Sequence, residues 1–163
     1  MEITTTSADA TQSFGEKVGY SLVSNREVIR TNPGQATVLT LSGELGSGKT
    51  TFVQGLAKGL GLAHRLVSPT FIIVKEYPLT NSKFKLFFHL DLYRVQTEAD
   101  LAGIDWTEIL TNPRNLVVIE WPAAIKVLLP KTVLEFSFKA NENGTHTITY
   151  PHIYLNLLNH LSS

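Results

Sequence analysis

Residues 43–50 read Gly-Glu-Leu-Gly-Ser-Gly-Lys-Thr, and this stretch decides the fold. It matches the pattern G-x-x-x-x-G-K-[S/T] at every defined position. Residues 36–42, just before it, are rich in β-branched side chains and predict a strand. After it, apolar side chains recur at helical spacing from Thr50 to Leu60, and Gly61 is placed to end that helix as a left-handed cap. A strand, this loop and a helix in that order are the context that a phosphate-binding loop requires.

The loop has the composition of an anion-binding site. Its glycines let backbone N–H groups turn inward around phosphate oxygens, and the helix after it offers unpaired N–H groups and the positive end of its dipole. Lys49 is expected to meet the outer phosphates, and the Thr50 hydroxyl to hold Mg²⁺, which prefers oxygen ligands. The alternative is a glycine-rich turn without a ligand. The residues expected to bind the nucleotide here are Glu44, Leu45, Gly46, Ser47, Gly48, Lys49, Thr50 and Thr51.

A nucleotide-hydrolysing site also needs a carboxylate at the end of an apolar strand, where it orders the metal ion or its water. Two residues qualify: Glu120 follows the apolar run 116–119, and Asp91 follows the run 86–90. Either acid has another interpretation, as a helix cap or as the partner of a base such as Arg94.

Weaker signals lie elsewhere in the chain. Ser68 and Thr70 flank a proline where GTPase-like folds carry a segment that senses the γ-phosphate, although a proline turn with solvated hydroxyls fits equally well. His89 lies within a strand pattern, which favours a core histidine over a ligand. Trp121 directly follows Glu120, so it belongs either to the core or close to a nucleotide. The sequence has no Asn-Lys-x-Asp segment of the guanine-recognition type, which favours adenine as the base.

The rest of the chain predicts the fold class. Ser7 is placed to cap a helix with an apolar stripe at Phe14, Val18 and Leu22, and residues 143–144, Asn-Gly, are typical of a hairpin turn. Strands with intervening helices, followed by a hairpin, predict an α/β sandwich of the P-loop NTPase type, with a mainly parallel sheet and an antiparallel edge near the C-terminus. We expect one domain over residues 1–163. The other expected elements are strands at 71–77, 84–92, 116–119, 132–139 and 145–150, helical turns within 98–110, a short connection at 122–130 and a short helix in the tail 152–163.

Composition excludes several classes of protein. The 163 residues contain no cysteine, which rules out disulfide frameworks, thiolate zinc sites and a cysteine nucleophile. The 14 Lys and Arg balance 14 Asp and Glu, so the molecule has no net charge with which to attract a nucleic acid. No apolar run approaches the roughly 18 residues that a membrane span needs. The N-terminus has no signal-peptide pattern, and we expect a cytoplasmic protein without membrane contact.

Four segments together carry a more specific signal than the loop alone. They read Gly-Glu-Leu-Gly-Ser-Gly-Lys-Thr-Thr at 43–51, Ser-Pro-Thr-Phe at 68–71, His-Leu-Asp-Leu-Tyr-Arg at 89–94 and Ile-Glu-Trp-Pro at 119–122. In this order and spacing they resemble the TsaE (YjeE-type) ATPase family, over roughly residues 8–140.

The resemblance implies an ATPase that works with the TsaD and TsaB proteins in making threonylcarbamoyladenosine on tRNA. In that family TsaD transfers the threonylcarbamoyl group, and ATP hydrolysis by the small ATPase supports repeated turnover of the complex. The tRNA is then reached only through the partners. Carried over by position, the resemblance implies that Thr50 and Glu120 hold Mg²⁺, that Asp91 is essential for hydrolysis, that Trp121 lies beside the nucleotide, and that Thr11 contacts the adenosine.

Two other functions stay open at this point. A small-molecule kinase uses the same loop to pass phosphate to a hydroxyl, but such kinases usually carry an arginine-rich lid, and this chain has five scattered arginines. A nucleotide-sensing module that hydrolyses little would use Thr70 as its switch. No arginine finger is evident, and a site without one is typically slower by about 10³- to 10⁵-fold, so we expect weak hydrolysis alone and stimulation by partners.

Overall fold

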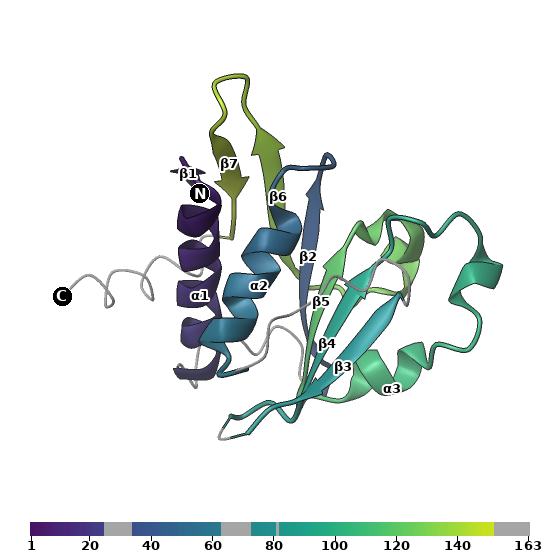
Figure 1. Ribbon diagram of the computed structural model, residues 1–163. Helices are drawn as coiled ribbons and strands as arrows, with labels where there is room; N and C mark the ends of the chain where they lie inside the picture. Colours follow the sequence, from purple (N-terminus) through teal and green to yellow (C-terminus); the bar gives the residue numbers. More distant parts are fainter. Residues whose placement is uncertain (25–33, 63–72, 81, 152–163) are drawn as a thin grey trace.

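The structure is a computed structural model that describes residues 1–24, 34–62, 73–80 and 82–151. Within these ranges, seven strands form one sheet in the order β1-β7-β6-β2-β5-β4-β3 (Figure 1). The strands are β1 (Glu2–Thr5), β2 (Thr37–Gly43), β3 (Val74–Pro78), β4 (Leu86–Asp91), β5 (Asn115–Glu120), β6 (Leu134–Ala140) and β7 (His146–Thr149). The helices are α1 (Ala8–Ser24), α2 (Lys49–Gly59) and α3 (Trp106–Thr111), with the 3₁₀ segments η1 (Glu98–Leu101) and η2 (Pro122–Leu128).

The centre of the sheet is parallel and both of its edges are antiparallel. β2 pairs in parallel with β5 and β6, and β5 pairs in parallel with β4. At one edge β7 and β1 add antiparallel strands, which confirms the predicted α/β sandwich with its C-terminal hairpin. The sequence predicts one antiparallel edge, but β3 forms a second one against β4, because the short connection between these strands favours a hairpin over a parallel crossover.

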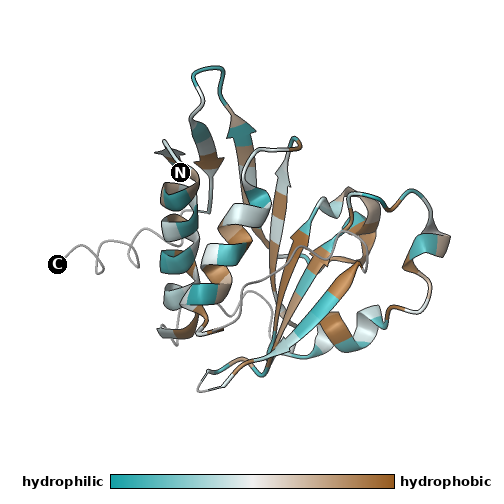
Figure 2. Ribbon diagram, in the orientation of Figure 1, coloured by the Kyte–Doolittle hydropathy of each residue, from teal (hydrophilic) through white to brown (hydrophobic). Residues whose placement is uncertain are grey.

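The helices α1 and α2 lie side by side on one face of the sheet (Figure 1). The Ser7 hydroxyl accepts a hydrogen bond of 3.1 Å from the Ala10 N–H, which confirms the predicted cap of α1. The predicted stripe on α1 is buried against α2 and the central strands, and Figure 2 shows hydrophobic residues concentrated on those strands. Gly61 (φ 83°) follows the end of α2 in the left-handed conformation, as predicted.

The opposite face of the sheet carries a second core. Ile109 and Leu110 of α3 and Ile125 of η2 pack there with residues of β4 and β5. The sequence predicts only a connection at 122–130, whereas the structure forms η2 there. This helix begins after Trp121, with Pro122 at its first position, where the missing proline N–H costs nothing.

Three predictions fall on residues outside the described ranges: the segment with Ser68 and Thr70, the first two residues of the strand at 71–77, and the helix in the tail 152–163. Within the described ranges, no helix has the length and apolar character needed to cross a membrane.

Candidate functional site

The loop between β2 and α2 forms a cradle of backbone groups. Gly46 (φ 78°) and Gly48 (φ 100°) adopt left-handed conformations, and Gly48 is the N-cap of α2. A Cβ at Gly46 would have no described atom within 4 Å, so the loop is open there. The first N–H groups of a helix have no partner within it, so a glycine-rich loop that leads directly into α2 is suited to binding an anion.

The Lys49 side chain lies inside the cradle. Its ammonium donates hydrogen bonds of 2.8 Å to the carbonyl oxygens of both Gly43 and Glu44, and one of 3.3 Å to Ser47 Oγ. The ammonium also lies 4.0 Å from the centre of the Trp121 ring, within range of a cation–π interaction. The loop therefore holds a positive charge where the outer phosphates of a nucleotide would lie.

The position of Lys49 predicts a pH effect. Burial lowers the pKa of its ammonium, and the carboxylates of Glu120 and Asp91 oppose this by a smaller amount. Only the charged ammonium attracts phosphate, so ATP affinity should fall as pH rises, with a midpoint below the ordinary lysine value of about 10.4. Titration of a fluorescent ATP analogue at increasing pH measures this. Lys49→Arg stays charged and should lose the alkaline decline; the same decline in both proteins would contradict the assignment.

Glu120, at the end of β5, is almost fully buried and has two hydrogen-bond partners among the described residues. The Thr50 hydroxyl lies 3.2 and 3.0 Å from its two carboxylate oxygens, and His89 Nε2 lies 2.9 Å from Oε1. The ionised carboxylate only accepts, so the hydroxyl and the imidazole N–H donate to it. His89 is buried as predicted, but its partner is the candidate catalytic acid. The hydrogen bonds from Thr50 and His89 hold the Glu120 carboxylate next to the first turn of α2.

The buried His89–Glu120 pair predicts a stability effect. Their side chains are 1% and 2% exposed, so His89→Leu would leave a buried carboxylate with Thr50 as its one remaining partner among those described. Removing one hydrogen-bond partner from a buried polar group costs about 1–3 kcal/mol, and more when the group is charged, whereas replacing both members by apolar residues of similar shape is close to neutral. Urea unfolding should therefore show a large loss for His89→Leu and a recovery for the double variant His89→Leu/Glu120→Leu. Equal stability of wild type and His89→Leu would refute this.

Asp91 ends β4 directly beside Glu120, because the two strands are parallel and the residues are paired in register. Its side chain is 5% exposed, and Oδ1 accepts a 3.1 Å hydrogen bond from the Tyr93 N–H. The described residues contain no group of three or more His, Asp or Glu that could hold a metal. Mg²⁺, however, is usually held by one or two carboxylates together with phosphates and water. The oxygen donors of Thr50, Glu120 and Asp91 fit that requirement.

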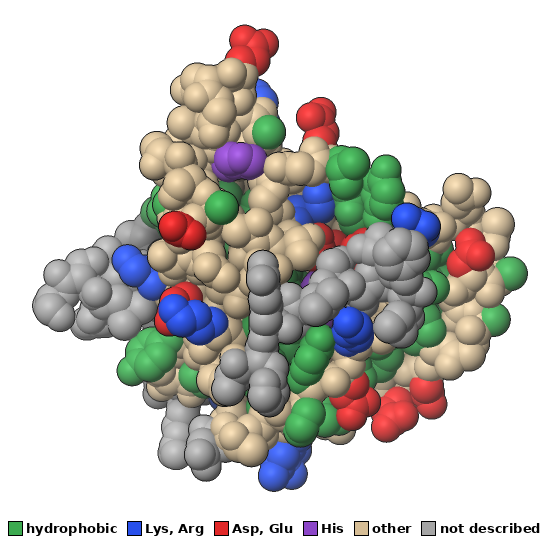
Figure 3. All heavy atoms as spheres, viewed as in Figure 1, with side chains coloured by type: hydrophobic (Ala, Val, Ile, Leu, Met, Phe, Trp, Pro, Cys, Tyr) green, Lys and Arg blue, Asp and Glu red, His purple; other side chains and the backbone are tan. Residues whose placement is uncertain are grey.

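A cavity of about 480 Å³ opens over the loop. On the face of the molecule seen in Figure 3, basic, acidic and hydrophobic side chains gather close together. The predicted residues that line the cavity are Leu45, Gly46, Ser47, Gly48, Lys49, Thr50, Thr51, Asp91, Glu120 and Trp121. Tyr93 and Arg94 also line it, although no motif in the sequence predicted them there. The Glu44 side chain is exposed and outside this lining; its carbonyl contacts Lys49 instead.

Two residues reach the loop from the other side. The Thr11 methyl carbon and His146 Nδ1 lie 3.5 and 3.6 Å from the place of a Cβ on Gly48. The Thr11 hydroxyl is 2.7 Å from the Thr5 hydroxyl, and His146 Nδ1 donates to the Ser47 carbonyl oxygen at 2.9 Å. The structure thus places Thr11 beside the loop but outside the cavity lining, and it adds His146, which no sequence motif indicated.

Comparison with known proteins decides the family. The model of the family "Threonylcarbamoyl adenosine biosynthesis protein TsaE" matches residues 5–148. The chain belongs to the TsaE family. The TsaE protein of Bacillus subtilis is 37% identical over 113 residues, which cover 69% of this chain and 68% of the relative. That of Borreliella burgdorferi is 39% identical over 66% of this chain and 76% of the relative. A crystal structure of B. subtilis YdiB matches 99% of this chain and 93% of its own with a TM-score of 0.64 and 27% identity.

The range matched by the TsaE family contains the whole site: the loop, both strand-end acids, Trp121 and Thr11. The relatives are named tRNA threonylcarbamoyladenosine biosynthesis proteins. Tyr93 and Arg94, which join the cavity lining, lie in the segment 89–94 that already suggested TsaE from the sequence. His146 lies outside the segments that carried that resemblance, so no signal in the sequence pointed to it.

Proposed function

We propose that this protein is a Mg²⁺-dependent ATPase of tRNA threonylcarbamoyladenosine biosynthesis, supporting repeated turnover of a TsaD–TsaB transferase complex without being the transferase. The observation that supports this best is the hydrogen bond of 3.0 Å between the Thr50 hydroxyl and Glu120. It joins the first residues of α2 to the carboxylate at the end of the neighbouring strand, as a site for a nucleotide and its metal ion requires.

Each residue of the site has a role in this proposal. The loop N–H groups and Lys49 bind the phosphates, with Lys49 exchanging its carbonyl partners for phosphate oxygens. Thr50 and Glu120 would hold Mg²⁺, which when bound neutralises charge that develops on the phosphates. Asp91, which is paired in register with Glu120, would orient the attacking water in this proposal.

Two features support the choice of adenine and the dependence on partners. The sequence lacks the guanine-recognition segment, and its net charge of zero agrees with a protein that reaches tRNA through a complex. Among the described residues, Lys49 and Arg94 are the cations that line the cavity. Because Arg94 is exposed to solvent, we do not assign it as an arginine finger, and we expect slow hydrolysis until TsaD and TsaB bind.

Reconstituted tRNA modification tests this function. TsaD and TsaB with their threonylcarbamoyl donor and tRNA should make product only in proportion to the complex present, and adding this protein with ATP should allow many rounds. Lys49→Ala should restore nothing, while the exposed-residue control Lys58→Ala should act like wild type. A product yield that does not depend on this protein would contradict the proposal and return attention to a kinase or a nucleotide sensor.

A further inference from the structure

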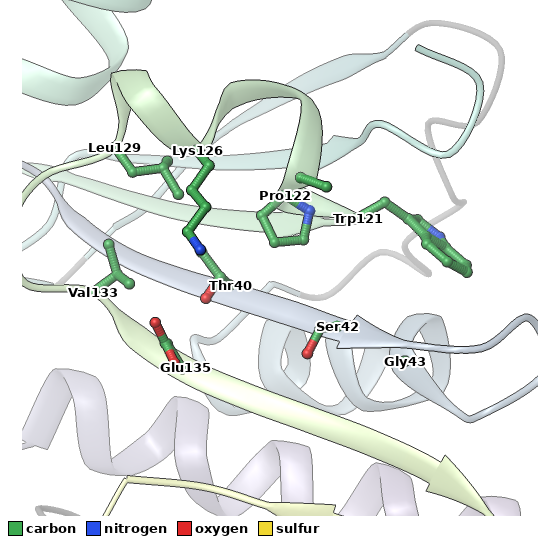
Figure 4. Close-up of a pocket in the computed structure, with 10 residues that line it drawn as sticks. Thr40, Ser42, Gly43, Trp121, Pro122, Lys126, Leu129, Val133 and Glu135 are labelled. Atoms are coloured by element: carbon green, nitrogen blue, oxygen red, sulfur yellow. The ribbon is translucent and has the colours of Figure 1, made fainter. Parts of the chain in front are cut away.

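A second cavity, of about 340 Å³, lies on the sheet face opposite α1 and α2. Figure 4 shows it between the end of β2, the start of β6 and η2. Its walls are mostly apolar, formed by Trp121, Pro122, Leu129 and Val133 among others. The volume is at the small end of the range for binding pockets, about 300–1,000 Å³, and suits one large side chain or a small ligand.

The apolar surface continues outside the cavity. Val127 and Leu128 lie on η2 between two residues that line it, and they are 93% and 46% exposed. Large apolar side chains exposed beside a pocket are typical of a protein–protein contact. A small ligand inside the cavity would leave both of them in water, so these two side chains favour a protein as the occupant.

Polar groups at the cavity show what an occupant must offer. Thr40, on its floor, is only 6% exposed, and no hydrogen bond of its hydroxyl is found among the described residues. In Figure 4, Lys126 extends from η2 toward β2, and Glu135 points into the cavity from β6. No salt bridge joins these two charges in the part of the chain that is described. An occupant that complements this site would therefore carry a hydrogen-bonding group at its tip and charges of both signs.

Trp121 connects this cavity to the nucleotide site, because it lines both. Its backbone is in the left-handed conformation (φ 60°), which is unfavourable for a bulky residue, and its N–H donates to the Leu41 carbonyl at 3.1 Å. The ring contacts the Lys49 ammonium on the nucleotide side. A molecule in the second cavity would therefore touch a residue that also contacts the phosphate-binding lysine.

We infer that the surface formed by this cavity and η2, which we call the η2 surface (residues 121–129 with Thr40, Val133 and Glu135), docks a segment of a partner protein. That segment inserts one side chain with an apolar stem and a polar tip toward Thr40. It carries an acidic residue near Lys126 and a basic residue near Glu135. The inference rests on the proposed function, because it takes the partner to be the TsaD–TsaB complex, and it provides a route from docking through Trp121 to Lys49.

Affinity for the TsaD–TsaB complex tests the η2 surface. Val127→Asp places a charge on the exposed apolar patch, and Lys126→Glu reverses a charge at its rim. Each should weaken binding by roughly tenfold or more, with ATP affinity of the free protein unchanged as evidence of correct folding. The effect of Lys126→Glu should shrink in high salt. The matched control is Tyr20→Asp, at a residue that is 51% exposed on α1, and it should bind like wild type.

The outcomes separate this inference from the function on which it rests. If the wild-type protein does not bind TsaD–TsaB, both are wrong. If it binds and both η2 variants bind equally well, the docking surface is wrong while the proposed function stands. If the variants change only self-association, measured by sedimentation, the η2 surface belongs to a second copy of this chain and the inference is overturned.

Discussion

Replacing Gly55 with alanine should lower the free energy of unfolding by about 3–5 kcal/mol, out of the 5–15 kcal/mol typical of a domain. A Cβ on Gly55 of α2 would collide with the Gln12 carbonyl oxygen of α1. Backbone atoms cannot move aside as a flexible side chain can. Alanine favours a helix by about 1 kcal/mol over glycine, but the collision costs more than this, so we expect a net loss of stability.

The collision is repeated along the contact between the two helices. A Cβ on Gly59 would strike the Glu16 carbonyl oxygen, and those on Gly15 and Gly19 of α1 would strike carbonyl oxygens of α2. The helices are therefore packed backbone to backbone, and α2 cannot shift without moving the loop at its N-terminus. Urea unfolding measures the effect. The control Lys58→Ala removes only an exposed salt bridge and should change stability by less than about 1 kcal/mol. A Gly55→Ala protein as stable as wild type would contradict this packing.

The second large effect is expected for Glu120→Gln. The amide has nearly the same shape and can still contact Thr50 and His89, but it lacks the negative charge that Mg²⁺ requires. We expect Mg²⁺-dependent ATP hydrolysis to fall by about 10²-fold or more. We also expect the Mg²⁺ concentration for half-maximal nucleotide binding to rise by about 10- to 100-fold.

Metal-free nucleotide binding separates this role from a structural one. Without Mg²⁺, Glu120→Gln should bind ATP as tightly as wild type or more tightly, because a negative charge near the phosphates is gone. Glu76→Gln, at an exposed residue of β3, is the matched control and should leave hydrolysis and Mg²⁺ dependence unchanged. An equal loss of ATP affinity with and without Mg²⁺ would instead mean that Glu120 holds the loop and not the metal.

Much of the site is predictable from the sequence because its parts are local. The loop pattern between a strand and a helix needs no long-range contact to be identified. The strand-end acids Asp91 and Glu120 follow from apolar runs, and a parallel sheet brings the ends of such strands together at one edge. Because β4 pairs in parallel with β5, the two separate motifs that contain Asp91 and Glu120 form one site.

The missed features depend on contacts between distant parts of the chain. β1 has four residues, three of them β-branched, but its partner β7 lies about 145 positions away, so the short local pattern does not by itself establish a strand. His89 is recognisable as buried, but its bond to Glu120 appears only once β4 and β5 are neighbours. η2 was not predicted, because the prolines that flank it are typical of a loop. The left-handed conformation of Trp121, after which η2 begins, is not visible in the sequence.

We propose that the loop at 43–50, with Glu120, is an ATP-hydrolysing site that responds to partners. The most direct test measures phosphate release from ATP with Mg²⁺ by the protein alone and with TsaD and TsaB, for wild type and Lys49→Ala. We predict slow release by the protein alone, faster release with the partners, and none above background for Lys49→Ala in either case. Release that is unchanged by saturating partners, or that survives the loss of Lys49, would contradict this claim.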